Sequence, residues 1–171
     1  RRYERGVIFG EERTIDGDPL FGVRLLVDIA LKALSAAVND PTTAVQVLDR
    51  LEDVLWVAAR RGDASGIEVD GDGRPRLLSS PPTWRDLLEL SLDEIMVYGA
   101  TAPQVMRRIG ALLDKLDDER VADDRRRLVH ECRERWLETV QHTDASPWIR
   151  AFSLVPDAGG IGPGSLHPPA A

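Results

Sequence analysis

The feature that most constrains the fold is a pair of helical segments joined at Val38-Asn39-Asp40-Pro41. Nearly every residue from 20 to 37 is apolar, and the polar exceptions recur at spacings of four, four and three. These exceptions form one stripe: Arg24, Asp28, Lys32 and Ser35. A helix that is apolar around most of its circumference is normally buried. The segment therefore predicts a central helix, about 27 Å long at 1.5 Å per residue.

Asp40 stands before a proline, which disfavours helical geometry at that residue. It can instead cap a second helix whose first position is Pro41. Apolar residues recur at helical spacing in this segment and in three later ones. We expect these helices at 41–61, 83–99, from 101 onward and at 119–142. The third of the five helices begins with a capping-box variant, Thr83-Trp84-Arg85-Asp86.

A small β element is expected beside the helices. The runs at 67–69 and 76–78 flank Asp70-Gly71-Asp72-Gly73, which is a hairpin signal, and Pro75 suits only an edge position. Val7-Ile8-Phe9 reads as a short strand or an extended arm that needs a partner strand. The fold class is therefore mainly α: a bundle of about five helices with an N-terminal strand and a hairpin near 67–78.

The chain divides into three expected parts. Residues 1–17 form an extended or β N-terminal arm that continues from a missing upstream part, because residue 1 is Arg and not Met. Residues 18–144 form the helical bundle. Residues 145–171 form a tail rich in proline and glycine, which could dock through Trp148 and Phe152 and is largely disordered after 156.

The charge balance excludes some partners. The formal net charge is −7, and affinity for nucleic acid rests on an excess of Lys and Arg, so we expect no nucleic-acid partner. Arginines at 107–108 and 125–127 lie in a segment with equal numbers of acidic residues, which indicates a solvated face of alternating charge. The single cysteine, Cys132, can form no internal disulfide, which fits a reducing compartment.

Two motifs resemble metal sites and fall short of them. His130-Glu131-Cys132-Arg133-Glu134 has Glu134 where a zinc-protease helix needs its second histidine. Asp70-Gly71-Asp72-Gly73 begins like a calcium loop, but the later glutamate is missing at the required spacing. We therefore expect no metal and no cofactor.

The polar stripe of the first helix has two interpretations. Arg24, Asp28 and Lys32 can form i,i+4 ion pairs, each contributing about 0.2–0.5 kcal/mol when exposed. Alternatively, they form a polar line that faces a partner, a cavity or the junction. Asn39 and Asp40 have the same two interpretations, as a cap or as a turn that faces a ligand.

The segment from Gly10 to Leu51 carries a long specific pattern. It comprises Arg13-Thr14, Asp18-Pro19-Leu20-Phe21-Gly22-Val23-Arg24, Leu26-Val27-Asp28-Ile29-Ala30, Ala33-Leu34-Ser35 and Asn39-Asp40-Pro41-Thr42-Thr43-Ala44. This pattern resembles the domain of unknown function 2254 family of predicted bacterial integral membrane proteins. Two positions depart from it: Gly17 stands where the family usually has Gln, and Ala36 where it usually has Pro. The second change should let the first helix run slightly further.

The resemblance implies a context rather than an activity. Several transmembrane helices would precede Arg1, and this chain would be the soluble C-terminal portion of a cell-membrane protein, for which we favour the cytoplasmic side. The upstream transmembrane portion is then the expected partner, with a homo-oligomer as a further option. The residues that match the motif are candidates to face a ligand or a partner: Arg13, Arg24, Asp28, Asn39, Asp40, Thr43, Asp49 and Arg50.

The leading hypothesis is non-enzymatic: a soluble regulatory or assembly domain of a multi-pass membrane protein of unknown activity, such as a channel or a transporter. The alternative is a domain that binds or converts a small anion, with four residues around one cleft: Arg13, Arg24, Asp28 and Asn39. An arginine beside a carboxylate and an amide can bind an anion through charge-assisted hydrogen bonds.

Overall fold

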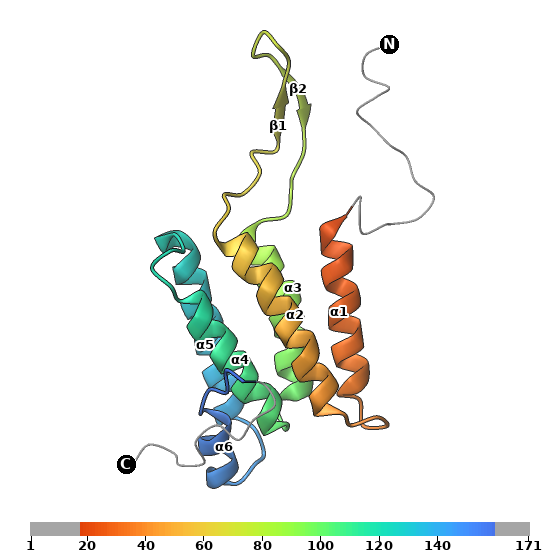
Figure 1. The fold of residues 1–171 in the computed structure, drawn as a ribbon, viewed down its shortest axis with the longest axis vertical. Helices are drawn as coiled ribbons and strands as arrows, with labels where there is room; N and C mark the ends of the chain where they lie inside the picture. Colours follow the sequence, from red (N-terminus) through yellow and green to blue (C-terminus); the bar gives the residue numbers. More distant parts are fainter. Residues whose placement is uncertain (1–17, 160–171) are drawn as a thin grey trace.

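The computed structural model describes residues 18–159, within which the chain forms six α-helices and one β-hairpin (Figure 1). The elements are α1 (Pro19–Ala33), α2 (Pro41–Ala59), β1 (Ile67–Val69), β2 (Pro75–Leu78), α3 (Trp84–Gly99), α4 (Pro103–Leu116), α5 (Asp123–Gln141) and α6 (Pro147–Ser153). The expected fold class, mainly α with a hairpin, is confirmed. The short helix α6 was not expected, because its residues were assigned to the tail.

Side chains cap the helices at the positions that the sequence indicates. Asp40 accepts a hydrogen bond from the backbone N–H of Thr43, 3.1 Å away, with Pro41 at the first position of α2. Thr83 and Asp86 cap α3 reciprocally, since each side chain accepts from the other's backbone N–H. Both capping predictions are confirmed, and both caps satisfy donors that the first turn of a helix leaves free.

The chain reverses between α1 and α2 sooner than expected. α1 ends at Ala33, and the Asp40 N–H donates to the Ala33 carbonyl over 2.8 Å. Asn39 has a φ of +48°, in the left-handed region that asparagine tolerates better than most residues. The prediction that Ala36 lets the first helix run further is therefore wrong, because the backbone turns back at Ala33 to form this closed loop.

The position of α1 also differs from the prediction. α1 packs chiefly on α2 and α3 and lies at one side of the bundle (Figure 1). Its Leu25 and Ile29 side chains are 39% and 50% exposed, so the expectation of a central, buried helix is wrong. The most covered helix is α4, which packs against α2, α3, α5 and α6.

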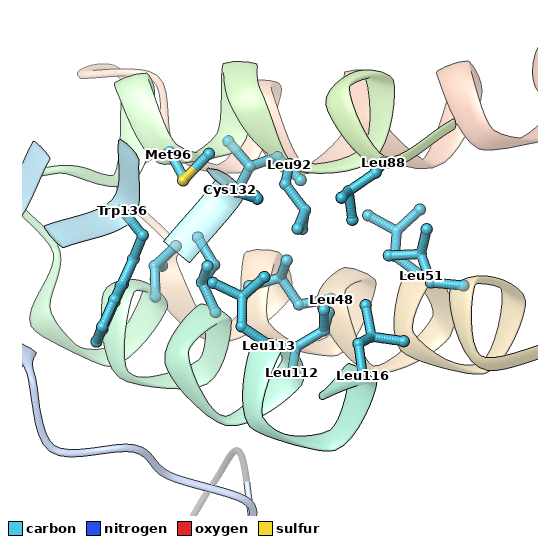
Figure 2. Close-up of a cluster of buried hydrophobic side chains, with 14 of the residues drawn as sticks. Leu48, Leu51, Leu88, Leu92, Met96, Leu112, Leu113, Leu116, Cys132 and Trp136 are labelled. Atoms are coloured by element: carbon cyan, nitrogen blue, oxygen red, sulfur yellow. The ribbon is translucent and has the colours of Figure 1, made fainter. Parts of the chain in front are cut away.

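The core lies between α2, α3, α4 and α5. Figure 2 shows leucines of α2, α3 and α4 facing one another, with Cys132 of α5 beside Leu92 and Trp136 at one end of the cluster. The residues expected to face inward from the fourth helix are all fully buried: Val105, Ile109, Leu112 and Leu116. At about 25 cal/mol per Å² of buried apolar surface, such a core is the main stabilising contribution to the bundle.

Two helices approach closely at Gly110. A Cβ atom at this position would lie 2.8 Å from Cζ2 of Trp136, a distance too short for a real contact. The indole also donates from Nε1 to the carbonyl oxygen of Met106, 2.9 Å away. Glycine at 110 therefore lets Trp136 of α5 lie directly on the backbone of α4.

The hairpin projects from one end of the bundle (Figure 1), and all residues of its strands are exposed. The carboxylate of Asp70 accepts from the backbone N–H groups of Asp72 and Arg74 and pairs with Arg76. The hydrogen bond from the Arg74 backbone is the main cause that lowers the pKa of Asp70. The side chain thus closes a tight turn. The expected strand at Val7-Ile8-Phe9 and most of the expected disordered tail lie outside the described residues.

Candidate functional site

Arg24 brings together two helices at the α1–α3 boundary. Its Nε donates to Oδ1 of Asp28 over 2.8 Å, and both of its terminal nitrogens donate to the carboxylate of Glu94 on α3. The expected i,i+4 pair is confirmed. Glu94 is a partner that the sequence analysis missed, because it lies 70 residues away in the chain. Lys32, the third member of the expected ladder, points outward as an exposed side chain.

The electrostatics of this cluster favour ion pairing. The hydrogen bond that Arg24 donates lowers the pKa of Glu94, and the hydrogen bonds that Arg24 donates to Glu94 and then to Asp28 raise the pKa of Arg24. The side chains of Arg24, Asp28 and Glu94 are 35%, 51% and 47% exposed, so solvent screens the attraction between their charges. Each such pair is worth about 0.2–1 kcal/mol. The guanidinium is thus already matched by two carboxylates, which disfavours binding of a further anion.

The junction residues form a separate cluster. The carboxylate of Asp40 accepts from both the backbone N–H and the hydroxyl of Thr43, and the hydroxyl bond is the main cause of its lowered pKa. Asn39 is exposed and adopts the left-handed turn. Local capping therefore accounts for the hydrogen bonds of Asp40 and Thr43, and a ligand-facing role for Asn39 stays a prediction.

Asp49 belongs to a third cluster, at the α2–α4 interface. Arg108 donates from Nε to Asp49 over 2.7 Å and from Nη2 to Glu52 over 2.6 Å, while Lys115 also pairs with Glu52. The Arg108 side chain is only 4% exposed. Burial by itself lowers the pKa of Arg108, but the hydrogen bonds to the two carboxylates raise it above its ordinary value.

The expectation of a solvated charged face is wrong for three of the five clustered arginines. Arg107, Arg108 and Arg125 are 4%, 3% and 7% exposed. Arg107 donates to the carbonyl of Val155 and stacks over the ring of Phe152, so it fastens α6 to α4. Buried charges must be paired or hydrogen-bonded, and these arginines are.

The remaining candidates do not join these clusters. Arg50 is exposed on α2 and lies 3.8 Å from Asp53, and Arg13 lies outside the described residues. Among residues 18–159, the predicted site residues therefore occupy separate places at the α1–α3 boundary, the junction, the α2–α4 interface and the surface of α2. This geometry gives no support to one small-anion cleft.

The hollow places of the molecule lie elsewhere. An open groove of about 590 Å³ lies at the hairpin end of the bundle, between the ends of α1, α2 and α3, and we call it the apolar groove. Its walls include Val54, Val57 and Trp84. The sequence analysis missed this groove, because the helix patterns that predict its walls do not show which helix ends meet.

In residues 18–159, no three His, Cys, Asp or Glu side chains gather closely enough to hold a metal ion. No helix in the same part of the chain is both long and apolar enough to cross a membrane.

The fold and the sequence together define a helical domain that belongs to a family of predicted membrane proteins. The chain belongs to the family described as predicted membrane protein, domain of unknown function 2254 (DUF2254), whose model matches residues 1–115. This match confirms the resemblance seen in the sequence. The chain is also 34% identical over 173 residues to uncharacterized proteins from Mycobacterium bovis and from two strains of Mycobacterium tuberculosis.

These alignments cover 99% of this chain and 33% of each relative. The chain thus spans about a third of the length of the curated relatives that it matches. No solved structure matches it.

Proposed function

We propose that this chain is a regulatory or assembly domain of a multi-pass membrane protein and that it lies outside the membrane. The family description and the one-third share of the relatives' length support a larger membrane protein as its context. The cytoplasmic side is our expectation, since a single cysteine can form no internal disulfide.

The observation that carries the proposal is the outer face of α1. Leu25 and Ile29, one helical turn apart on this helix, are both exposed. Exposed apolar side chains that gather on one side of a domain are typical of interaction surfaces. We assign this face to the rest of the same polypeptide, because about two thirds of the relatives' length lies outside the part that this chain matches.

Cysteine accessibility tests this assignment. Ile29→Cys and Arg50→Cys place thiols on α1 and on the exposed surface of α2, where Arg50 is 75% exposed. The native Cys132 is buried, so it should add little background labelling from this domain. In the full-length protein in native membranes, a maleimide should modify Arg50→Cys readily and Ile29→Cys slowly, whereas both should react in the 171-residue chain.

Equal reactivity of the two thiols in the full-length protein would contradict the proposal. Protection of Ile29→Cys in the 171-residue chain, together with a doubled mass in solution, would assign the same face to a homo-oligomer. Whether the parent is a channel or a transporter then depends on flux measurements with the full-length protein.

A further inference from the structure

The apolar groove has the size and the walls of a ligand site. Binding pockets for small molecules commonly enclose about 300–1,000 Å³ and are mostly apolar with a few polar groups at one end. The groove, at about 590 Å³, falls within that range. Its apolar walls come from three helices and include Leu20, Val23, Val54, Val57, Trp84 and Leu87.

A second hollow, of about 280 Å³, adjoins one end of the groove. The two share four lining residues: Arg61, Gly62, Asp63 and Arg125. Arg60 and Arg120 also line the second hollow, and we call it the arginine hollow. The apolar groove therefore adjoins a hollow lined by four arginines and two aspartates, in a protein whose net charge is −7.

Two of these arginines are neutralised within the fold. Arg125 donates to the Ala58 carbonyl and to the carboxylate of Asp63, which ties α5 to the end of α2. Arg120 forms two hydrogen bonds, of 2.8 and 2.9 Å, with Asp118. These pairs build the walls of the arginine hollow.

The other two arginines form no salt bridge among the described residues, although the charge of Arg60 contributes to the lowered pKa of Asp118. Within residues 18–159, neither Arg60 nor Arg61 lies within 4.0 Å of a carboxylate, and the guanidinium of Arg60 lies over the ring of Trp56. Arg61 lines both hollows. Asp124 lines only the arginine hollow and Asp18 only the groove, while Asp63 at the shared rim is paired with Arg125. Among the described residues, Arg61 is therefore the arginine at that rim without a salt bridge.

We propose that the apolar groove and the arginine hollow together bind one long-chain carboxylate, such as a fatty acid. The acyl chain lies along Val54, Val57 and Trp84, and the carboxylate lies at the shared rim, where Arg61 donates charge-assisted hydrogen bonds. The groove suits a single chain rather than a bilayer surface, because the net charge of −7 repels anionic membranes and the arginines line hollows. This site is independent of the assembly role of α1.

Calorimetric titration of the 171-residue chain with oleate, below the concentration at which oleate aggregates, tests the site. Arg61→Glu should weaken oleate binding at least about tenfold by reversing the charge at the rim. Arg50→Glu, on α2 and also exposed to solvent, should leave the affinity unchanged. Val57→Asp, in the wall of the groove, should weaken binding about tenfold, whereas Val97→Asp on α3 should not.

Two further probes separate the two halves of the site. Oleyl alcohol has the same chain without the charge and should bind about tenfold more weakly than oleate, and inorganic phosphate alone should not compete. Absence of oleate binding, equal binding of the alcohol, or equal effects of Arg61→Glu and Arg50→Glu would overturn the proposal. It would also be overturned by a dimer that dissociates on Val57→Asp while oleate fails to bind, because the groove would then hold a second copy.

Discussion

α1 and α4 both pack on α2, on opposite sides of it in Figure 1, and they differ in how much of their surface is covered. α1 has long apolar side chains in contact with water, while α4 buries two arginines. α4 packs against four helices, α2, α3, α5 and α6, whereas α1 contacts chiefly α2 and α3. The number of neighbouring helices, rather than the apolar content of the helix itself, therefore decides which side chains are buried.

The largest difference that we expect between the two regions is in thiol reactivity. Burial raises the pKa of Cys132 on α5 to about 12 from its ordinary value of 9.0, which lowers its thiolate fraction at pH 8 about a thousandfold. Ile29→Cys on α1 should react with a disulfide reagent at the rate of a free thiol. Fast modification of Cys132 in the folded protein would show that the packing around this residue of α5 opens in solution.

The next largest difference between α1 and α4 should be the loss in free energy of unfolding when a leucine is truncated. Leu112→Ala removes a fully buried side chain of α4 and should lower the free energy of unfolding by about 3 kcal/mol. Leu25→Ala on the outer face of α1 should cost less than about 0.5 kcal/mol. Urea titrations of the two variants measure both values, and similar losses would contradict the arrangement described above.

Substitution of the buried arginine of α4 should lower the free energy of unfolding by somewhat less than truncation of a core leucine. Arg108→Ala leaves Asp49 and Glu52 without their buried guanidinium and should cost about 2–3 kcal/mol. Arg108→Lys keeps the charge but loses the fork geometry, so an intermediate loss is expected. These losses should change little with added salt, because the group is shielded from solvent. A strong dependence on salt would place Arg108 at the surface.

Substitution of Arg24, in the exposed cluster at the α1–α3 boundary, should give the smallest loss in free energy of unfolding. Arg24→Ala should cost less than about 1 kcal/mol at pH 7, because solvent screens the cluster. The pKa of Glu94 is lowered from 4.5, so the stabilisation is complete above pH 4.5 and is lost as the pH falls through the lower folded value. Measured in acid, the wild type and the Arg24→Ala variant should converge, and a difference that grows below pH 4.5 would contradict this assignment.

Local signals in the sequence predicted local structure well. Asp40, the Thr83–Asp86 capping box and the hairpin turn each depend on residues within a few positions of one another, and each is present. The family motif also identified Asp49, which contributes to a partly buried ion pair. Such features need no knowledge of the rest of the fold.

Features that depend on distant segments could not be predicted from patterns alone. Glu94 lies 70 residues from Arg24, and Asp49 lies 59 residues from Arg108, and nothing in the helix patterns specifies those two pairs. One signal for a buried Arg108 was available, since it lies three residues after Val105 and four before Leu112, on the apolar side of its helix. The apolar groove requires the relative placement of three helix ends, which periodicity does not give.

The contact between Gly110 and Trp136 bears on where this domain can be cut for recombinant work. The family model ends at residue 115, but the indole that covers Gly110 belongs to α5 and lies beyond that limit. A chain truncated at 115 would leave Gly110 and its neighbours in α4 facing water and would remove Val129, Cys132 and Trp136 from the core. The smallest piece suited to expression therefore extends past the family boundary to the end of α5.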